Sequence, residues 1–112
     1  MRNKVILVSS NQLGKGDEVL GETILETFFT ILKQRDEFPI AIFCMNSGVL
    51  TTTEDSLVSV HLKELQDKGV PVLVCKTCAD HYGIENRLSV GKISGMGEFI
   101  ELAAKYEVLT IS

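Results

Sequence analysis

Apolar residues in this chain form short continuous runs, separated by segments in which they recur at helical spacing. Continuous apolar runs of four to seven residues are typical of parallel strands covered on both faces. We expect five strands on this basis, at Lys4–Val8, Pro39–Met45, Val70–Cys75, Ser89–Ile93 and Val108–Ile111. Of these, Ser89–Ile93 carries the weakest pattern.

The segment Asp17–Arg35 carries the clearest helical pattern. Asp17 is suited to open a helix, because its side chain can cap free backbone N–H groups. A wide apolar stripe is expected to pack on the sheet. It recurs every four residues, at Leu20, Ile24, Phe28 and Leu32, and is flanked by Val19, Leu25, Phe29 and Ile31.

Three further helices are expected. Two overlapping capping-box patterns, Thr51…Glu54 and Thr52…Asp55, predict the start of a helix that ends at Lys68-Gly69. A brief helix capped by Thr77 and Asp80 is expected to end at Gly83, and a small amphipathic helix contains the apolar positions Phe99, Ile100, Ala103 and Ala104.

The alternation of strands and helices predicts one α/β domain over residues 1–112, with a mainly parallel sheet of four or five strands and helices on both faces. In such sheets the loops beyond the carboxyl ends of the strands form the ligand-facing edge. The loops expected there are Ser9–Gly16, Met45–Leu50, Cys75–Asp80 and Ser94–Gly97.

Charge and composition narrow the classes of partner. The net charge is −4 and no basic run occurs, so nucleic acid and anionic membrane are not expected partners.

No apolar run approaches the roughly 18 residues of a membrane span. The opening Met1–Lys4, followed by only four apolar residues, indicates a first strand rather than a signal peptide. The odd number of cysteines, three, favours a reducing cytoplasm.

The candidate chemistry is concentrated where the third strand ends. Cys75, Cys78 and His81 lie within seven residues, in a Cys-x-x-Cys at a strand-to-helix turn. The thiolate is the reactive form of cysteine, whose ordinary pKa is about 8.5. A helix start and the neighbouring Lys76 are expected to favour a partial thiolate.

The residues alone leave several interpretations of these cysteines open. In one, Cys75 takes a sulfur from a persulfide donor and Cys78 resolves or receives it. A thioredoxin-type disulfide couple is disfavoured, because both prolines of the chain lie upstream of the motif. A zinc site would use Cys44, Cys75, Cys78 and His81, although a domain with its own core has little need of one.

Other candidate positions are weaker. Gly14-Lys15-Gly16 lacks the spacing of known phosphate loops, so no cofactor is predicted and a nucleotide site there is a minor alternative. We interpret His61 as a packed histidine and Cys44 as a small buried residue. His81 is a candidate proton donor, and Thr77 with nearby backbone N–H groups is a candidate support for a thiolate.

Several motifs together resemble the DsrE/DsrF-like family, and most of all the C-terminal domain of YedF-like proteins associated with selenium metabolism. The resemblance covers nearly the whole chain. It rests on Gly14–Asp17, Asn46-Ser47-Gly48-Val49, Thr53-Glu54-Asp55-Ser56, Cys75-x-Thr77-Cys78, Tyr82-Gly83 and Val90-Gly91-x-Ile93.

The resemblance implies a three-layer αβα fold and sulfur or selenium handling. In sulfur-relay members of the family a cysteine eight residues before a glycine carries the persulfide, and that position is Cys75, before Gly83. Cys78 matches the YedF-like Cys-Gly-Thr-Cys pattern, although Lys76 replaces its glycine. Asn46 and Gly48 are then expected to support the site.

The resemblance also implies a homo-oligomer, a trimer or a hexamer. The Cys-Pro-x-Pro motif of a TusA-like domain is absent here, so a TusA-like carrier is expected on a separate chain. Two interpretations remain at this point: a sulfurtransferase-like carrier, and a non-catalytic oligomer that senses redox state or binds zinc.

Overall fold

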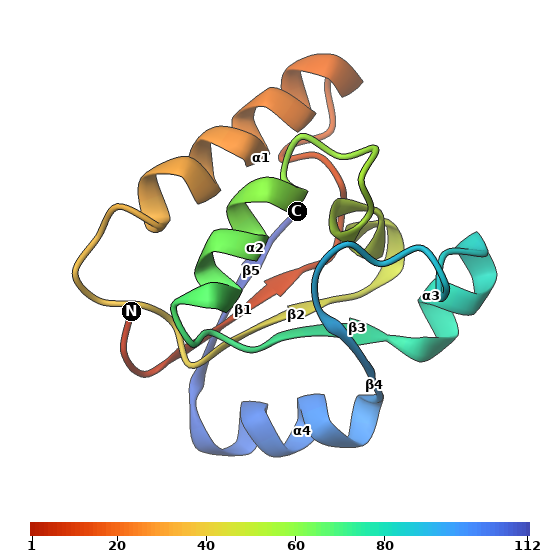
Figure 1. Cartoon of the computed structure of the whole chain (residues 1–112). Coiled ribbons are helices and arrows are strands. Elements are labelled where there is room, and N and C mark those ends of the chain that lie inside the picture. Colours follow the sequence, from red (N-terminus) through yellow and green to blue (C-terminus); the bar gives the residue numbers. More distant parts are fainter.

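The computed structural model describes residues 1–112 and contains a five-stranded sheet in which every pairing is parallel. Its strand order is β4-β3-β2-β1-β5 (Figure 1). The strands are β1 (Lys4–Val8), β2 (Ala41–Cys44), β3 (Val72–Cys75), β4 (Lys92–Ser94) and β5 (Glu107–Ile111). All five expected strands exist, with ends that differ by up to three residues.

Helices cover both faces of this sheet. Figure 1 shows α1 (Glu18–Leu32) and α2 (Ser59–Asp67) on one face and α4 (Met96–Lys105) on the other. The short helix α3 (Lys76–Tyr82) follows β3 at the edge of the sheet, and a 3₁₀ helix, η1 (Asn46–Thr52), follows β2. This confirms the expected three-layer α/β fold.

The core lies between the central strands and the α1–α2 layer. Every residue of β2 and β3 is buried, as a continuous apolar run in a parallel sheet predicts. Phe29 of α1 and Leu62 and Leu65 of α2 are completely buried. On the other face the cover is thinner: α4 has no fully buried residue, and its main aromatic contact is Phe99 against Phe43, with ring centroids 5.1 Å apart.

The predicted apolar stripe of α1 was correct in part. Leu25, Phe29 and Leu32 are buried, together with Gly21, whereas Leu20 and Ile24 are exposed. Apolar residues surround most of this helix, so their period alone does not select a face. The predicted start is confirmed, because the Asp17 side chain accepts a hydrogen bond of 2.8 Å from the N–H of Leu20.

The two capping boxes predicted at Thr51–Asp55 do not form. Instead, the hydroxyls of Thr51, Thr52 and Thr53 donate to carbonyl oxygens three residues earlier, as short polar side chains do when they compete with regular helix. These residues belong to η1 and its end, and α2 begins only at Ser59.

The predicted end of α2 is confirmed. Gly69 adopts a left-handed φ of +99°, and the N–H of Val70 bonds the carbonyl of Leu65. This is the glycine-dependent turn that terminates many helices.

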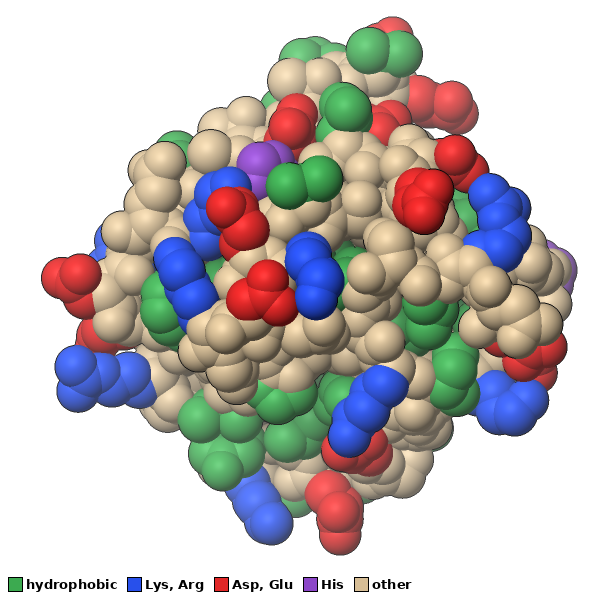
Figure 2. Space-filling model, in the orientation of Figure 1, with side chains coloured by type: hydrophobic (Ala, Val, Ile, Leu, Met, Phe, Trp, Pro, Cys, Tyr) green, Lys and Arg blue, Asp and Glu red, His purple; other side chains and the backbone are tan.

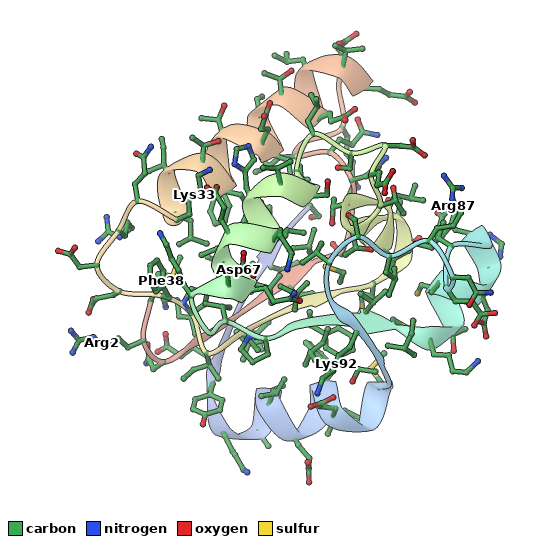
Figure 3. The ribbon with its side chains drawn as sticks, viewed as in Figure 1. Arg2, Lys33, Phe38, Asp67, Arg87 and Lys92 are labelled. Atoms are coloured by element: carbon green, nitrogen blue, oxygen red, sulfur yellow. The ribbon has the colours of Figure 1, made fainter.

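The surface carries charges of both signs. Figure 2 shows acidic and basic side chains interspersed over the face that it presents. In Figure 3 the labelled basic residues Arg2, Arg87 and Lys92 lie on separate parts of the molecule. None of the helices has both the length and the apolar character needed to cross a membrane.

Candidate functional site: the Cys75–Cys78 pair

The junction between β3 and α3 places two thiols side by side. Cys75 is the last residue of β3 and the N-cap of α3, with an extended backbone (φ −60°, ψ 121°). Cys78 is the third residue of α3. The side chains of an N-cap residue and of the third helical residue lean toward each other, which is the geometry that a capping box uses. The Cys-x-x-Cys spacing therefore brings the two sulfur atoms together.

The cap that we predicted from Thr77 and Asp80 is absent. Cys75 takes the N-cap position. The carboxylate of Asp80 instead forms an ion pair with the Lys76 ammonium group, over 2.9 Å. The predicted end is correct, since Gly83 has a left-handed φ of +66°.

A turn from the neighbouring strand completes the site. The backbone N–H of Asn46 donates to the sulfur of Cys78 over 3.0 Å. Asn46 itself has a φ of +51°, a left-handed conformation that asparagine tolerates better than most residues. Two residues on, a Cβ added to Gly48 would lie 2.0 Å from the carbonyl oxygen of Val8. Only glycine lets this turn pass so close over the end of β1.

The two thiols line a cavity of about 410 Å³ at the carboxyl edge of the sheet. Its other lining residues are Met45, Asn46, Thr77, His81, Tyr82 and Met96. No lysine, arginine or carboxylate contributes to this lining. Cys75 is buried, with 6% of its surface exposed, whereas Cys78 is half-buried.

The environment of Cys78 differs from the expectation of a partial thiolate. Burial raises the pKa of the Cys78 thiol, and the adjacent Cys75 raises it further through a hydrogen bond and its charge, while the N–H of Asn46 lowers it. Lys76 lies in ion pairs with Asp80 and, at 4.0 Å, with Glu85. Its charge is thus engaged outside the cavity, and Cys78 holds its proton more tightly than an ordinary cysteine.

Cys44 does not belong to this site. In the sheet Cys44 pairs with Val74, so strand alternation directs Cys44 and Cys75 to opposite faces. Cys44 is completely buried, which raises the pKa of its thiol to about 12 despite a hydrogen bond with Thr51.

The proposed zinc set is therefore not assembled. No group of three or more His, Cys, Asp or Glu side chains is arranged to hold a metal ion. The alternative with Cys44, Cys75, Cys78 and His81 was wrong because successive residues of a strand point to opposite faces of the sheet. This alternation separates Cys44 from Cys75.

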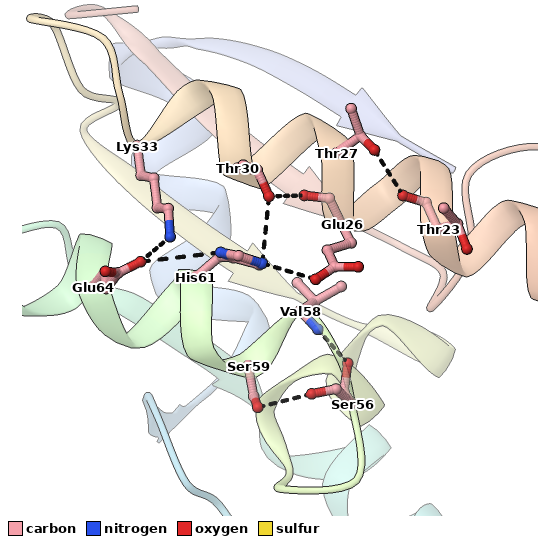
Figure 4. A network of polar contacts seen from close by, with 10 residues as sticks. All are labelled: Thr23, Glu26, Thr27, Thr30, Lys33, Ser56, Val58, Ser59, His61 and Glu64. Carbon is pink, nitrogen blue, oxygen red and sulfur yellow. Dashed lines mark hydrogen bonds and ion pairs between the residues drawn. The ribbon is translucent and has the colours of Figure 1, made fainter.

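The two histidines occupy different environments. His81 is exposed at the cavity, edge-to-face with Tyr82 at 5.0 Å. His61 lies between α1 and α2, where its Nε2 is 3.1 Å from Glu26 and 3.3 Å from Thr30 (Figure 4). Glu64, one turn further along α2, forms an ion pair with Lys33, the residue that follows α1. His61 is thus a packed histidine in a helix–helix contact, as predicted.

Some cavity residues were not predicted from the sequence. Met45, Tyr82 and Met96 line the cavity, but none was a candidate. Met45 and Met96 could have been predicted, because they fall in loops expected at the ligand-facing edge.

The loop Gly14–Gly16 borders a separate cavity of about 460 Å³, lined only by polar residues and glycines. Lys15 and Glu18 contribute opposite charges to it. It does not include either thiol.

The sequence and the fold of this chain are similar to those of known proteins. A model of the DsrE/DsrF-like family matches residues 22–111. The fold is similar to the crystal structure of the ychN protein from E. coli, with a TM-score of 0.74 and 23% identity over 99% of this chain and 100% of that one. MTH1491 from Methanobacterium thermoautotrophicum, a protein of unknown function, gives a TM-score of 0.69 and 17% identity over 98% and 99% of the two chains. No curated protein matches.

The structural likenesses lie below 25% identity and establish the fold. The family match covers four-fifths of the chain and includes both cysteines, the cavity and four of the five strands. The chain belongs to the DsrE/DsrF-like family.

Proposed function

We propose that this protein accepts and transfers sulfur, or its heavier congener selenium, as a persulfide on Cys75, with Cys78 assisting. The observation that carries the proposal is the pair of adjacent thiols in a cavity at the carboxyl edge of the sheet. Membership of a family associated with sulfur relay supports it. The protein would be a sulfurtransferase-like carrier.

Sulfur transfer requires one thiolate and a space that can hold the transferred sulfur atom. The Cys75 thiolate attacks the outer sulfur of a donor persulfide, forming a sulfur–sulfur bond and releasing the donor as a thiolate. The transferred sulfur then occupies the cavity. Cys78, which keeps its proton, would donate a hydrogen bond to the neighbouring sulfur. The exposed His81, which lines the cavity, would protonate the leaving donor.

The partners follow from the proposal. The donor or acceptor is a separate relay protein such as a TusA-like carrier, and the chain works as a trimer or hexamer in the cytoplasm, where thiols stay reduced. The absence of lysine, arginine and carboxylate side chains from the cavity lining favours a sulfur atom carried on a protein thiol over a small sulfur oxyanion.

The test is intact-mass spectrometry after incubation with a cysteine desulfurase and cysteine. The wild type and the Cys44→Ala control should gain about 32 Da, the mass of one sulfur atom, and Cys75→Ser should not. The absence of an adduct from both Cys75 and Cys78 would refute the proposal.

A redox-sensing oligomer is the second candidate. It is favoured by the same adjacency of Cys75 and Cys78, which suits a reversible disulfide. A protein that forms this disulfide but never carries sulfur from the desulfurase would be a sensor.

A further inference from the structure

The two sulfur atoms of a persulfide on Cys75 would differ sharply in access. The inner sulfur is Cys75 Sγ itself, on a residue that is 6% exposed. The outer sulfur would project into the open cavity, where an acceptor thiol can reach it. An external thiol can therefore reach the outer sulfur more readily than the inner one.

One group in the structure reaches the inner sulfur from within the chain. Cys78 lies next to Cys75 through the N-cap geometry, and the two side chains interact. The Asn46 N–H, 3.0 Å from Cys78 Sγ, favours the thiolate form of Cys78 when its proton leaves. Cys44, the remaining thiol, points to the opposite face of the sheet.

We propose that Cys78 provides a second exit for the carried sulfur, by attacking Cys75 Sγ and expelling the outer sulfur as hydrosulfide. This inference rests on the proposed function, because it requires a persulfide on Cys75. The site would then either pass its sulfur to an acceptor thiol or, when no acceptor is docked, release sulfide and close as a Cys75–Cys78 disulfide.

The step balances without an added reagent. The Cys78 thiolate forms the Sγ–Sγ bond with Cys75, and the bond between Cys75 Sγ and the outer sulfur breaks. The outer sulfur leaves with that electron pair as hydrosulfide and is thereby reduced, while the Cys78 sulfur is oxidised from the thiol to the disulfide level. Cys75 Sγ is already at that level in the persulfide. The proton lost by Cys78 passes to solvent or to His81. A dithiol reductant, either protein or small molecule, then restores both thiols.

The experiment starts from protein loaded with sulfur by a cysteine desulfurase and freed of small thiols. During incubation without reductant, wild type should release about one equivalent of sulfide per loaded chain and become about 2 Da lighter than the reduced protein, the loss of two hydrogens. Cys78→Ser should keep the adduct and release no sulfide. Cys44→Ala is the matched control and should behave as wild type.

The outcomes separate this inference from the proposed function. If wild type keeps a stable adduct on Cys75, or if Cys78→Ser releases sulfide as fast as wild type, the internal exit is refuted and the carrier role stands. If no adduct forms on wild type, both fail. Peptide mapping of the disulfide must identify Cys75 and Cys78, and a disulfide that includes Cys44 contradicts the proposal.

Discussion

At the scale of single residues, the three cysteines of this chain have three distinct environments. Cys44 is sealed in the core, Cys75 is nearly buried at the end of β3, and Cys78 is half-buried at the cavity. Their reactivity should follow access and pKa rather than position in the chain.

Cys44 should be inert in the folded protein. Because burial raises the pKa of its thiol to about 12, roughly one molecule in ten thousand carries the thiolate near pH 8. We expect iodoacetamide to leave Cys44 unmodified until the protein is unfolded by denaturant, as peptide mass spectrometry would show. Rapid labelling of Cys44 under native conditions would contradict the described core.

The raised pKa of Cys78 should depend on its neighbour. Cys75 raises that pKa through a hydrogen bond and its charge, so Cys75→Ala should lower it, and the rate of alkylation of Cys78 should begin to rise at lower pH than in wild type. The measurement is the pH profile of the alkylation rate, followed by mass spectrometry. The control Cys44→Ala should leave the pH profile of Cys78 alkylation unchanged. If Cys75→Ala also left this profile unchanged, the thiols of Cys75 and Cys78 would not interact.

At the scale of elements, the turn between β2 and η1 is as important as the helix that carries the thiols. Gly48 brings the turn against the end of β1, and Asn46 directs its N–H at Cys78. The sequence presents this as Asn-Ser-Gly, a common turn composition, and only the close approach to Val8 shows why glycine is required.

Gly48→Ala should therefore be costly in both stability and site geometry. The added methyl would lie 2.0 Å from a backbone oxygen, so the turn must move, and a loss of roughly 1–3 kcal/mol in the free energy of unfolding is expected. Denaturant melts would measure it, and the pH profile of Cys78 alkylation should shift upward as the Asn46 hydrogen bond weakens.

The matched control is Gly97→Ala in α4. Nothing lies within 4 Å of a Cβ there, so the substitution should leave stability unchanged or improve it by up to about 1 kcal/mol. Equal losses at Gly48 and Gly97 would contradict the steric argument.

At the scale of the whole molecule, the surface retains apolar side chains on both helical layers. Leu20 and Ile31 of α1 are more than half exposed, as is Ile100 of α4, and Met96 connects the α4 face to the cysteine cavity. Exposed apolar side chains gathered on a helix face are typical of contact surfaces.

We accordingly expect the homo-oligomer of the proposed function to be measurable in solution. Light scattering should give a multiple of the chain mass of 12.3 kDa. Leu20→Lys and Ile100→Lys test the α1 and α4 faces separately, and the variant with the lower mass identifies the interface. A mass of 12.3 kDa for wild type at every concentration would exclude the oligomer.

Much of the fold was predictable because it depends on local patterns. Continuous apolar runs gave the strands, Asp17 gave the start of α1, and Gly69 and Gly83 gave the ends of α2 and α3, since each acts through its own neighbours in the chain. The capping boxes at Thr51–Asp55 failed because the threonine hydroxyls bonded backward within η1 instead.

The sequence by itself determined that Cys75 and Cys78 share a strand-to-helix turn at one edge of a parallel sheet, because a spacing of three residues acts locally. Only the tertiary structure decided which groups join them. The Asn46 N–H reaches Cys78 across 32 positions of the chain, while Cys44, at the end of the adjacent strand, is directed away from Cys75. The physical reason is strand register: a shift of one residue reverses the face that a side chain occupies, and register is fixed by packing between strands.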